Sequence, residues 1–203
     1  MIRKIIELLT GRRGKTEPVV GGHVTSDGVL LNDIDGFDAP FAAAMRNEGY
    51  QLAESIALEK VENAPQAVES WMCLTYASQM LKKFEEAIEA CERAMAISPD
   101  DETINYARGF ISQDQADECL DREEFAEADR HFNSAVQYYS TAIAIDAGYS
   151  NAYYGLAAAH EGLGNHDLVI TYATRYLELE PDSLKRDDAL DMIRVAKSLA
   201  TDP

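Results

Sequence analysis

The feature that most constrains the fold of this chain is a repeated interval of 34 residues. Pro65 and Pro99 are separated by this interval, and so are Ala147 and Pro181. Between these two pairs, the step from Pro99 to Ala147 is 48 residues. A fixed period of about 20–50 residues indicates a repeat array, in which each unit buries its apolar face against the next unit.

Residues 68–101 and 150–183 are two copies of one pattern. The pattern residues of the first copy are Trp71, Leu74, Phe84, Ala87, Cys91, Ala94 and Pro99. Those of the second copy are Tyr153, Leu156, Ala157, Gly164, Val169, Ala173, Tyr176 and Pro181. Both copies resemble the tetratricopeptide repeat (TPR). The resemblance implies an all-α, right-handed superhelical array of antiparallel helix pairs, whose first helices line a concave groove that binds another protein.

The residue types of the repeat suit a close pair of helices. A large residue on the first helix meets small residues on the second, such as Ala87 and Ala94, so that the two backbones can approach each other. Gly164 suits the turn inside a pair, and a closing proline such as Pro99 ends the second helix.

The 48-residue unit exceeds the standard repeat by 14 residues, which is two heptads. Both helices can therefore lengthen by about two turns and keep their apolar faces aligned. Within a unit of 102–149 we predict one helix over 102–121 and its partner over 124–146. The alternative is a standard repeat at 116–149 preceded by an extra helix, but it would place Arg122 and Glu123 at core positions. The predicted inward-facing residues of the second helix are Phe125, Ala128, Phe132, Ala135, Tyr139 and Ala142.

The remaining segments complete an array of about four units. Residues 34–67 are predicted to form a degenerate first repeat with Asp38 as its N-cap, and residues 184–203 a C-terminal capping helix and tail. The Gly-rich segment 11–36 is predicted to be a linker in which an Asp-Gly turn could close a small hairpin. Residues 1–10 are predicted to form a basic amphipathic helix.

The charge of the chain is unevenly distributed. Of 203 residues, 36 are acidic and 18 are basic, which gives a net charge of −18. Residues 1–16 contain five Lys or Arg and one Glu, a net charge of +4, so the rest of the chain carries −22. This balance argues against nucleic acid as a partner, because phosphate binding depends on Lys and Arg. The basic segment is instead expected to dock on an acidic protein surface or, weakly, on an anionic membrane.

Cysteine usage points to a reducing compartment. Cys73, Cys91 and Cys119 are widely spaced and form no Cys-x-x-Cys motif, so we interpret them as small buried residues. The N-terminal apolar stretch is interrupted by Glu7 and followed by Arg12, and it fits neither a secretory signal nor a membrane span. The sequence therefore predicts a cytoplasmic protein.

No constellation of residues for catalysis or for a cofactor is found. His23, His131, His160 and His166 are scattered along the chain, and no phosphate loop, dinucleotide fingerprint or serine-nucleophile motif occurs. The acidic residues around Gly36 lack the glutamate that an EF-hand calcium loop requires. We therefore expect no enzyme activity, no metal and no cofactor.

A second set of residues on each first helix is predicted to face the groove. Their aromatic, methionine and carboxylate side chains suit a basic or amphipathic peptide that is partly apolar. Alternatively, Met72, Met80 and Leu120 only cover neighbouring repeats. Family members that clamp the C-terminal carboxylate of heat-shock chaperones use Lys, Asn and Arg on this face, and here only Asn151 is of these types. The predicted groove residues are Met72, Tyr76, Gln79, Met80, Phe110, Asp114, Asp117, Asp121, Asn151, Tyr154 and Glu161.

The sequence thus predicts a non-enzymatic interaction module, either a scaffold or a chaperone-like adaptor, that holds a basic or apolar segment of another protein. The alternative is a self-assembling scaffold whose basic N-terminal helix, within residues 1–16, docks on a neighbouring subunit or on a membrane surface. By resemblance, small acidic arrays of this kind include secretion-system chaperones and organelle-assembly scaffolds.

Overall fold

The structure is a computed structural model that describes residues 36–200, and within this range the chain forms helices and connecting loops without a β-strand. The predicted helix over 1–10 and, apart from Gly36, the predicted linker and hairpin over 11–36 lie outside the described residues. The helices of the described part are α2 (Ala39–Arg46), α3 (Tyr50–Asn63), α4 (Val68–Met80), α5 (Phe84–Ile97), α6 (Glu102–Asp121), α7 (Phe125–Ile145), α8 (Ser150–Gly162), α9 (His166–Leu179) and α10 (Arg186–Ala200).

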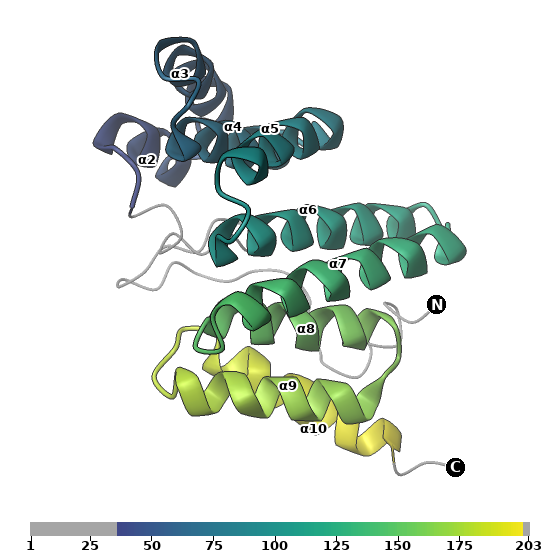
Figure 1. Cartoon of the computed structure of the whole chain (residues 1–203). Helices are drawn as coiled ribbons and strands as arrows, with labels where there is room; N and C mark the ends of the chain where they lie inside the picture. Colours follow the sequence, from purple (N-terminus) through teal and green to yellow (C-terminus); the bar gives the residue numbers. More distant parts are fainter. Residues whose placement is uncertain (1–35, 201–203) are drawn as a thin grey trace.

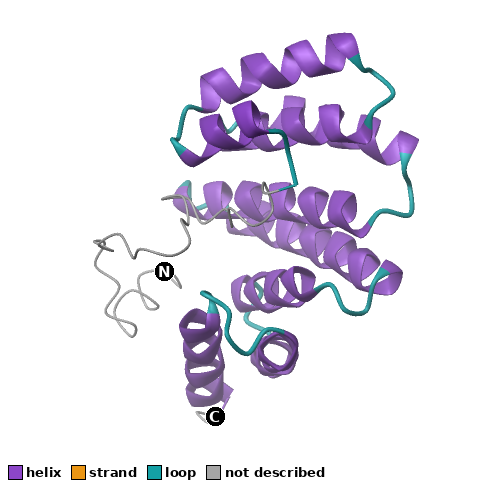
Figure 2. Cartoon of the chain, turned by 90° about the vertical axis from the view of Figure 1, so that its left-hand side faces the viewer, coloured by secondary structure: helices purple, strands orange, loops and turns teal. Residues whose placement is uncertain are grey.

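Consecutive helices pair and the pairs stack on one another (Figure 1). α2 packs on α3, α4 on α5, α6 on α7 and α8 on α9, while α10 covers α9 and α8. Between units, the second helix of one pair contacts the first helix of the next, which produces the layers seen in Figure 2. Within residues 36–200, this arrangement confirms the predicted all-α array of four helix pairs with a lengthened third unit and a C-terminal capping helix.

A residue in the left-handed conformation marks the turn inside each pair. These residues are Glu48 (φ 57°), Lys82 (φ 58°), Glu123 (φ 61°) and Gly164 (φ 72°). The steps from Lys82 to Glu123 and from Glu123 to Gly164 are both 41 residues, seven more than the standard repeat. α6 and α7 are therefore each one heptad longer, as predicted. Because α6 is one continuous helix of 20 residues, the alternative with a separate extra helix is wrong.

The four turns are closed by the same backbone hydrogen bond. The residue that follows the left-handed position donates its N–H to the carbonyl oxygen five residues earlier, which satisfies an otherwise unpaired carbonyl at the helix end. The four donor–acceptor pairs are Gly49 to Ala44 (2.9 Å), Lys83 to Ser78 (2.9 Å), Glu124 to Cys119 (2.8 Å) and Asn165 to His160 (2.9 Å).

Aromatic side chains of α7 pack directly on glycines of the neighbouring helices. Tyr139 lies between Gly109 of α6 and Gly155 of α8, where an added Cβ atom would come within 2.7 Å and 2.6 Å of its ring. Phe132 covers Gly162 of α8, where an added Cβ atom would lie 2.4 Å from the ring. Two aromatics seven residues apart thus face two α8 glycines seven residues apart, which fixes the register between the third and fourth units.

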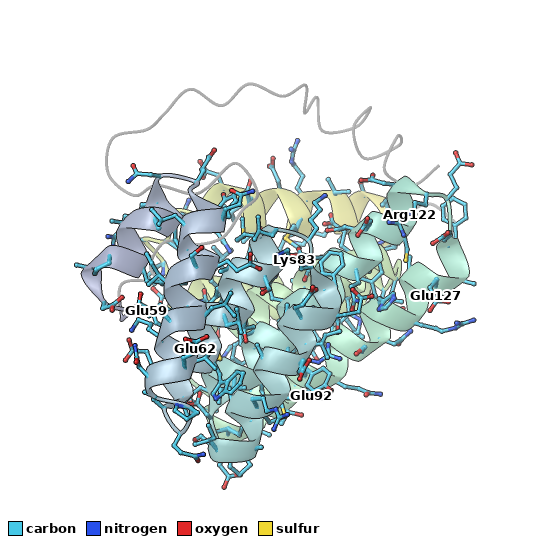
Figure 3. The ribbon with its side chains drawn as sticks, turned by 90° about the horizontal axis from the view of Figure 1, so that it is seen from above. Glu59, Glu62, Lys83, Glu92, Arg122 and Glu127 are labelled. Carbon is cyan, nitrogen blue, oxygen red and sulfur yellow. The ribbon has the colours of Figure 1, made fainter. Side chains whose placement is uncertain are left out.

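One prediction for the inward face of α7, the burial of Phe125, is wrong. Phe125 is 47% exposed, whereas Phe84 at the equivalent position of α5 is 8% exposed. Short loops tie the other ends of α6 and α7 to their neighbours, so the added heptads carry the turn roughly 10 Å further out. Figure 3 shows Arg122 and Glu127, on either side of this turn, at the opposite edge of the molecule from Glu59 and Glu62 of α3. The other predicted residues, Ala128, Phe132, Ala135, Tyr139 and Ala142, are buried.

The first unit is joined to the second by ion pairs. Asp38 is the N-cap of α2, as predicted, and accepts a hydrogen bond from the Phe41 N–H at 3.3 Å. Lys60 of α3 occupies the position that corresponds to Ala94 of α5, and its Nζ lies 3.0 Å from both Asp38 Oδ2 and Glu69 Oε1. A long cation therefore replaces a small residue and links α2, α3 and α4.

Gly155→Ala is expected to lower the free energy of unfolding by about 2 kcal/mol, because the added methyl group overlaps the Tyr139 ring. In an unobstructed helix the same change would raise it by about 1 kcal/mol. Urea unfolding followed by circular dichroism measures the difference. Gly36→Ala, where nothing lies within 4 Å of the added atom, is the control. Equal unfolding free energies for the two variants would contradict the packing described above.

Phe84 and Phe125 occupy equivalent repeat positions. The variants Phe84→Ala and Phe125→Ala are nevertheless expected to differ in their free energy of unfolding. Removing the buried Phe84 ring should lower the free energy of unfolding by about 3–4 kcal/mol, since it leaves a cavity. Removing the half-exposed Phe125 ring should lower it by about 1 kcal/mol or less. The measurement is the same unfolding experiment on both variants, and a Phe125→Ala loss as large as that of Phe84→Ala would show that the turn of α6 and α7 is covered.

Candidate protein-binding surface

The predicted groove residues lie on α4, α6 and α8, the first helices of the second, third and fourth pairs. α6 contacts both α4 and α8, so the structure places these three helices side by side. We call the eleven predicted residues together the first-helix face. Their part in binding stays a prediction, whereas their positions and contacts are described below.

The α4 residues of the first-helix face are mostly buried. Met72 is 4% exposed, Tyr76 1% and Gln79 2%, while Met80 is half-buried. Met72 and Tyr76 belong to the core of the first two units, and the Tyr76 ring lies edge-on to Phe37 at 5.8 Å. These contacts show that Met72 and Tyr76 pack in the interior of the array.

The α6 residues form an acidic row. Asp114 is half-buried, and Asp117 and Asp121 are exposed; steps of three and four residues place all three on one side of the helix. Gln79 Nε2 donates a hydrogen bond to Asp114 Oδ2 at 2.8 Å, which joins α4 to α6. Half-buried Phe110 precedes the row by one turn. Along this side of the helix, one apolar residue is therefore followed by three acidic ones.

The pKa of Tyr139 on α7 is affected by the negative charge of this row. Its pKa is raised well above the usual value, first by burial and then by the nearby charges of Asp114 and Asp117. The Tyr139 hydroxyl donates to Gln113 Oε1 at 3.1 Å. The repeat pattern identified Tyr139 as a packing residue, and nothing in its spacing indicated that its hydroxyl would reach α6.

On α8, the residues Asn151, Tyr154 and Glu161 are half-buried. The Tyr154 ring lies edge-on to Tyr176 of α9 at 5.2 Å, and Lys185 Nζ sits 4.5 Å from the centre of the Tyr154 ring. Lys185 lies in the loop before α10, outside every repeat, so the repeat period could not identify this contact. The C-terminal end of the first-helix face therefore differs from the acidic row, because a lysine covers its tyrosine.

The thiols and the buried histidine of the described chain are groups of the packed interior. Cys73 and Cys91 are free and buried, and burial raises the pKa of each thiol to about 12. The pKa of the Cys119 thiol is also raised by burial. His160 is buried and stacked on Tyr172 with ring centroids 5.5 Å apart, and burial lowers its pKa. Near pH 7 these thiols stay protonated and this imidazole stays neutral.

Within residues 36–200, no three His, Cys, Asp or Glu side chains are grouped so that they could hold a metal ion. Asp38, one of the acidic residues considered as a calcium ligand, caps α2 instead. In the same part of the chain, no helix is both long enough and apolar enough to cross a membrane.

Comparison with known proteins identifies the repeat and the fold. A tetratricopeptide-repeat family model matches residues 76–101 and 150–183. A crystal structure of MamA aligns with a TM-score of 0.58 and 17% identity over 79% of each chain. A second MamA crystal structure aligns with a TM-score of 0.55 and 16% identity over 81% of this chain and 96% of that chain. No curated protein matches the sequence significantly.

A crystal structure of PilW, a widely conserved type IV pilus biogenesis factor, aligns with a TM-score of 0.36 and 18% identity over 78% of this chain and 86% of that chain. The two MamA structures share the helical array with this chain, and arrays of this repeat are protein–protein interaction scaffolds. The 34-residue period, the stacked helix pairs and the family match agree, and the chain contains tetratricopeptide repeats at residues 76–101 and 150–183.

Proposed function

We propose that the chain is a non-enzymatic scaffold that binds a basic, partly apolar segment of another protein on its first-helix face. The observation that carries this proposal is the acidic row of Asp114, Asp117 and Asp121 on one side of α6. Carboxylates arranged in a row attract Lys and Arg of a partner and disfavour acidic segments. After burial, the charges of Asp114 and Asp117 are the next causes that raise the pKa of Tyr139, so both carboxylates act at this place.

The apolar residues around the row favour a partner that also carries apolar side chains. Met80, Phe110 and Tyr154 are half-buried and lie on three successive first helices. A flexible methionine adapts to irregular shapes, and aromatic rings provide large contact area at interfaces. An extended or helical segment that alternates basic and apolar residues would contact both kinds of side chain.

The proposal includes a cytoplasmic location. Its support is the three free, buried cysteines, which are typical of proteins from a reducing compartment. The net charge of −18 argues against nucleic acid as the partner. A protein segment is therefore the ligand class that the acidic row fits best.

A capped synthetic peptide of the stated chemistry, Ac-LKALKALKALKA-NH2, tests this function on the full-length chain. We expect it to bind, and we expect Asp117→Lys to weaken binding about tenfold in low salt, because the variant replaces an attraction by a repulsion. Fluorescence anisotropy of the labelled peptide measures the affinity. Glu92→Lys makes the same charge change on α5, at the position labelled in Figure 3, and should leave the affinity nearly unchanged. Equal weakening by both variants would contradict recognition by the first-helix face.

A second candidate function is self-assembly through the basic N-terminal segment. The observation that favours it is the charge of +4 on residues 1–16 against −22 on the rest of the chain. The segment itself lies outside the described residues, so its docking site on a neighbouring subunit, or its contact with a membrane, is argued from charge alone.

Self-assembly predicts that charge reversal at Arg3 and Lys4 to Glu lowers the average mass of the full-length chain in low salt. Static light scattering over a range of protein concentrations measures it. Arg93→Glu, which removes an exposed arginine of α5, is the control and should leave the mass unchanged. Identical masses for all three proteins would rule out assembly through this segment, and flotation with anionic vesicles then tests the membrane alternative.

A further inference from the structure

Gln79 is a buried polar side chain that is only half satisfied. It lies on α4, is 2% exposed, and its Nε2 donates to Asp114 Oδ2 at 2.8 Å. Its Oε1 is buried and has no hydrogen-bond partner within the described chain. An amide oxygen without a donor is unfavourable in a protein interior, so a buried one indicates a donor that arrives from elsewhere.

The orientation of this amide follows from Asp114. A carboxylate oxygen accepts hydrogen bonds, so the NH2 group of Gln79 must face it and the amide oxygen must point away. Oε1 and Nε2 share one carbon atom, which keeps Oε1 close to the same carboxylate. The contact between α4 and α6 therefore places two kinds of acceptor near each other, one of them charged.

Such an acceptor pair favours a cation over a neutral donor. Asp117 follows Asp114 by one turn and adds negative charge, and the raised pKa of Tyr139 has both carboxylates among its causes. Hydrogen bonds from an ammonium or guanidinium group to carboxylates are shorter and stronger than neutral ones. Lysine and arginine also carry several N–H donors on one group, which suits two acceptors that lie close together.

The site can be reached from the first-helix face. Asp114 is half-buried rather than enclosed, so part of the residue borders the solvent. Met80, the residue after Gln79, is also half-buried, and an unbranched methionine can change rotamer to admit the end of a slim side chain. The ligand group would contact Asp114 first and Gln79 Oε1 behind it.

We infer that Gln79 and Asp114 together bind the cationic end of one lysine or arginine side chain of the partner segment. This inference rests on the proposed function. It names the site at which one basic side chain of the partner binds. The Asp117 and Asp121 carboxylates then attract the partner over a longer range, while the buried amide oxygen of Gln79 selects a donor of defined position.

Nuclear magnetic resonance of the 15N-labelled full-length protein tests the site directly. The probes are Nα-acetyl-lysine amide, Nα-acetyl-arginine amide and, as an apolar control of similar size, Nα-acetyl-norleucine amide. We expect at least one of the two cations to shift the Gln79 side-chain amide resonance in a saturable way. The cation that binds with the higher affinity identifies the preferred side chain. Norleucine amide should cause no shift. Equal shifts from norleucine and from the cations would overturn the inference.

Variants separate this site from general attraction by the acidic row. Asp114→Asn keeps the shape of the side chain and should weaken cation binding about tenfold, and Gln79→Leu should do the same. For Gln79→Leu, circular dichroism verifies the fold. Glu92→Gln removes an exposed carboxylate of α5, outside the first-helix face, and is expected to have little effect. Asp114→Asn binding as tightly as the unmodified protein would also overturn the inference.

The outcomes distinguish this inference from the proposed function. If the leucine–lysine peptide binds and Asp117→Lys weakens it, but the Gln79 amide does not respond to lysine or arginine amide, the proposed function stands and the cation site is wrong. If the Gln79 amide responds as expected and the peptide does not bind, the cation site stands and segment binding is wrong.

Discussion

The packing of two α7 aromatics on glycines of α6 and α8 is the contact on which the middle of the array depends. Tyr139 fits between Gly109 and Gly155, and Phe132 covers Gly162, because a glycine leaves room for a ring where any side chain would collide with it. Helices can approach closely only where one side is small. These contacts hold the third unit to the fourth in one register. They therefore join the lengthened unit to the last pair, on which the capping helix packs.

The same lengthened unit shapes the candidate binding surface. A first helix of standard length, such as α4 or α8, has 13 residues, whereas α6 has 20. Asp117 and Asp121 lie in the additional part of α6. The added heptad thus does two things: it extends the acidic row of the first-helix face, and it carries the turn of α6 and α7 beyond the neighbouring pairs. The exposed Phe125 follows from the second effect.

A polar contact interrupts the apolar packing between the second and third units. The core of a repeat array is largely interchangeable between units, since equivalent positions carry similar apolar residues. Gln79 and Asp114 break this pattern, because they place an amide and a carboxylate where α4 meets α6. An apolar pair at this place would pack as well and would attract no donor. This polar pair is the site that we propose for the cation of the partner segment.

The period of the sequence determined the helix pairs, the turn at Gly164, the long helices of the third unit and the residue types of the first-helix face, because each repeat is a local pattern of about 34 residues. The tertiary structure decided what lies between repeats. The exposure of Phe125 depends on where the neighbouring helix pairs end. The packing of the Tyr139 ring on two glycines depends on two other helices. The Gln79–Asp114 hydrogen bond joins residues 35 positions apart. Contacts of this kind arise from how the units stack, which periodicity within a unit does not specify.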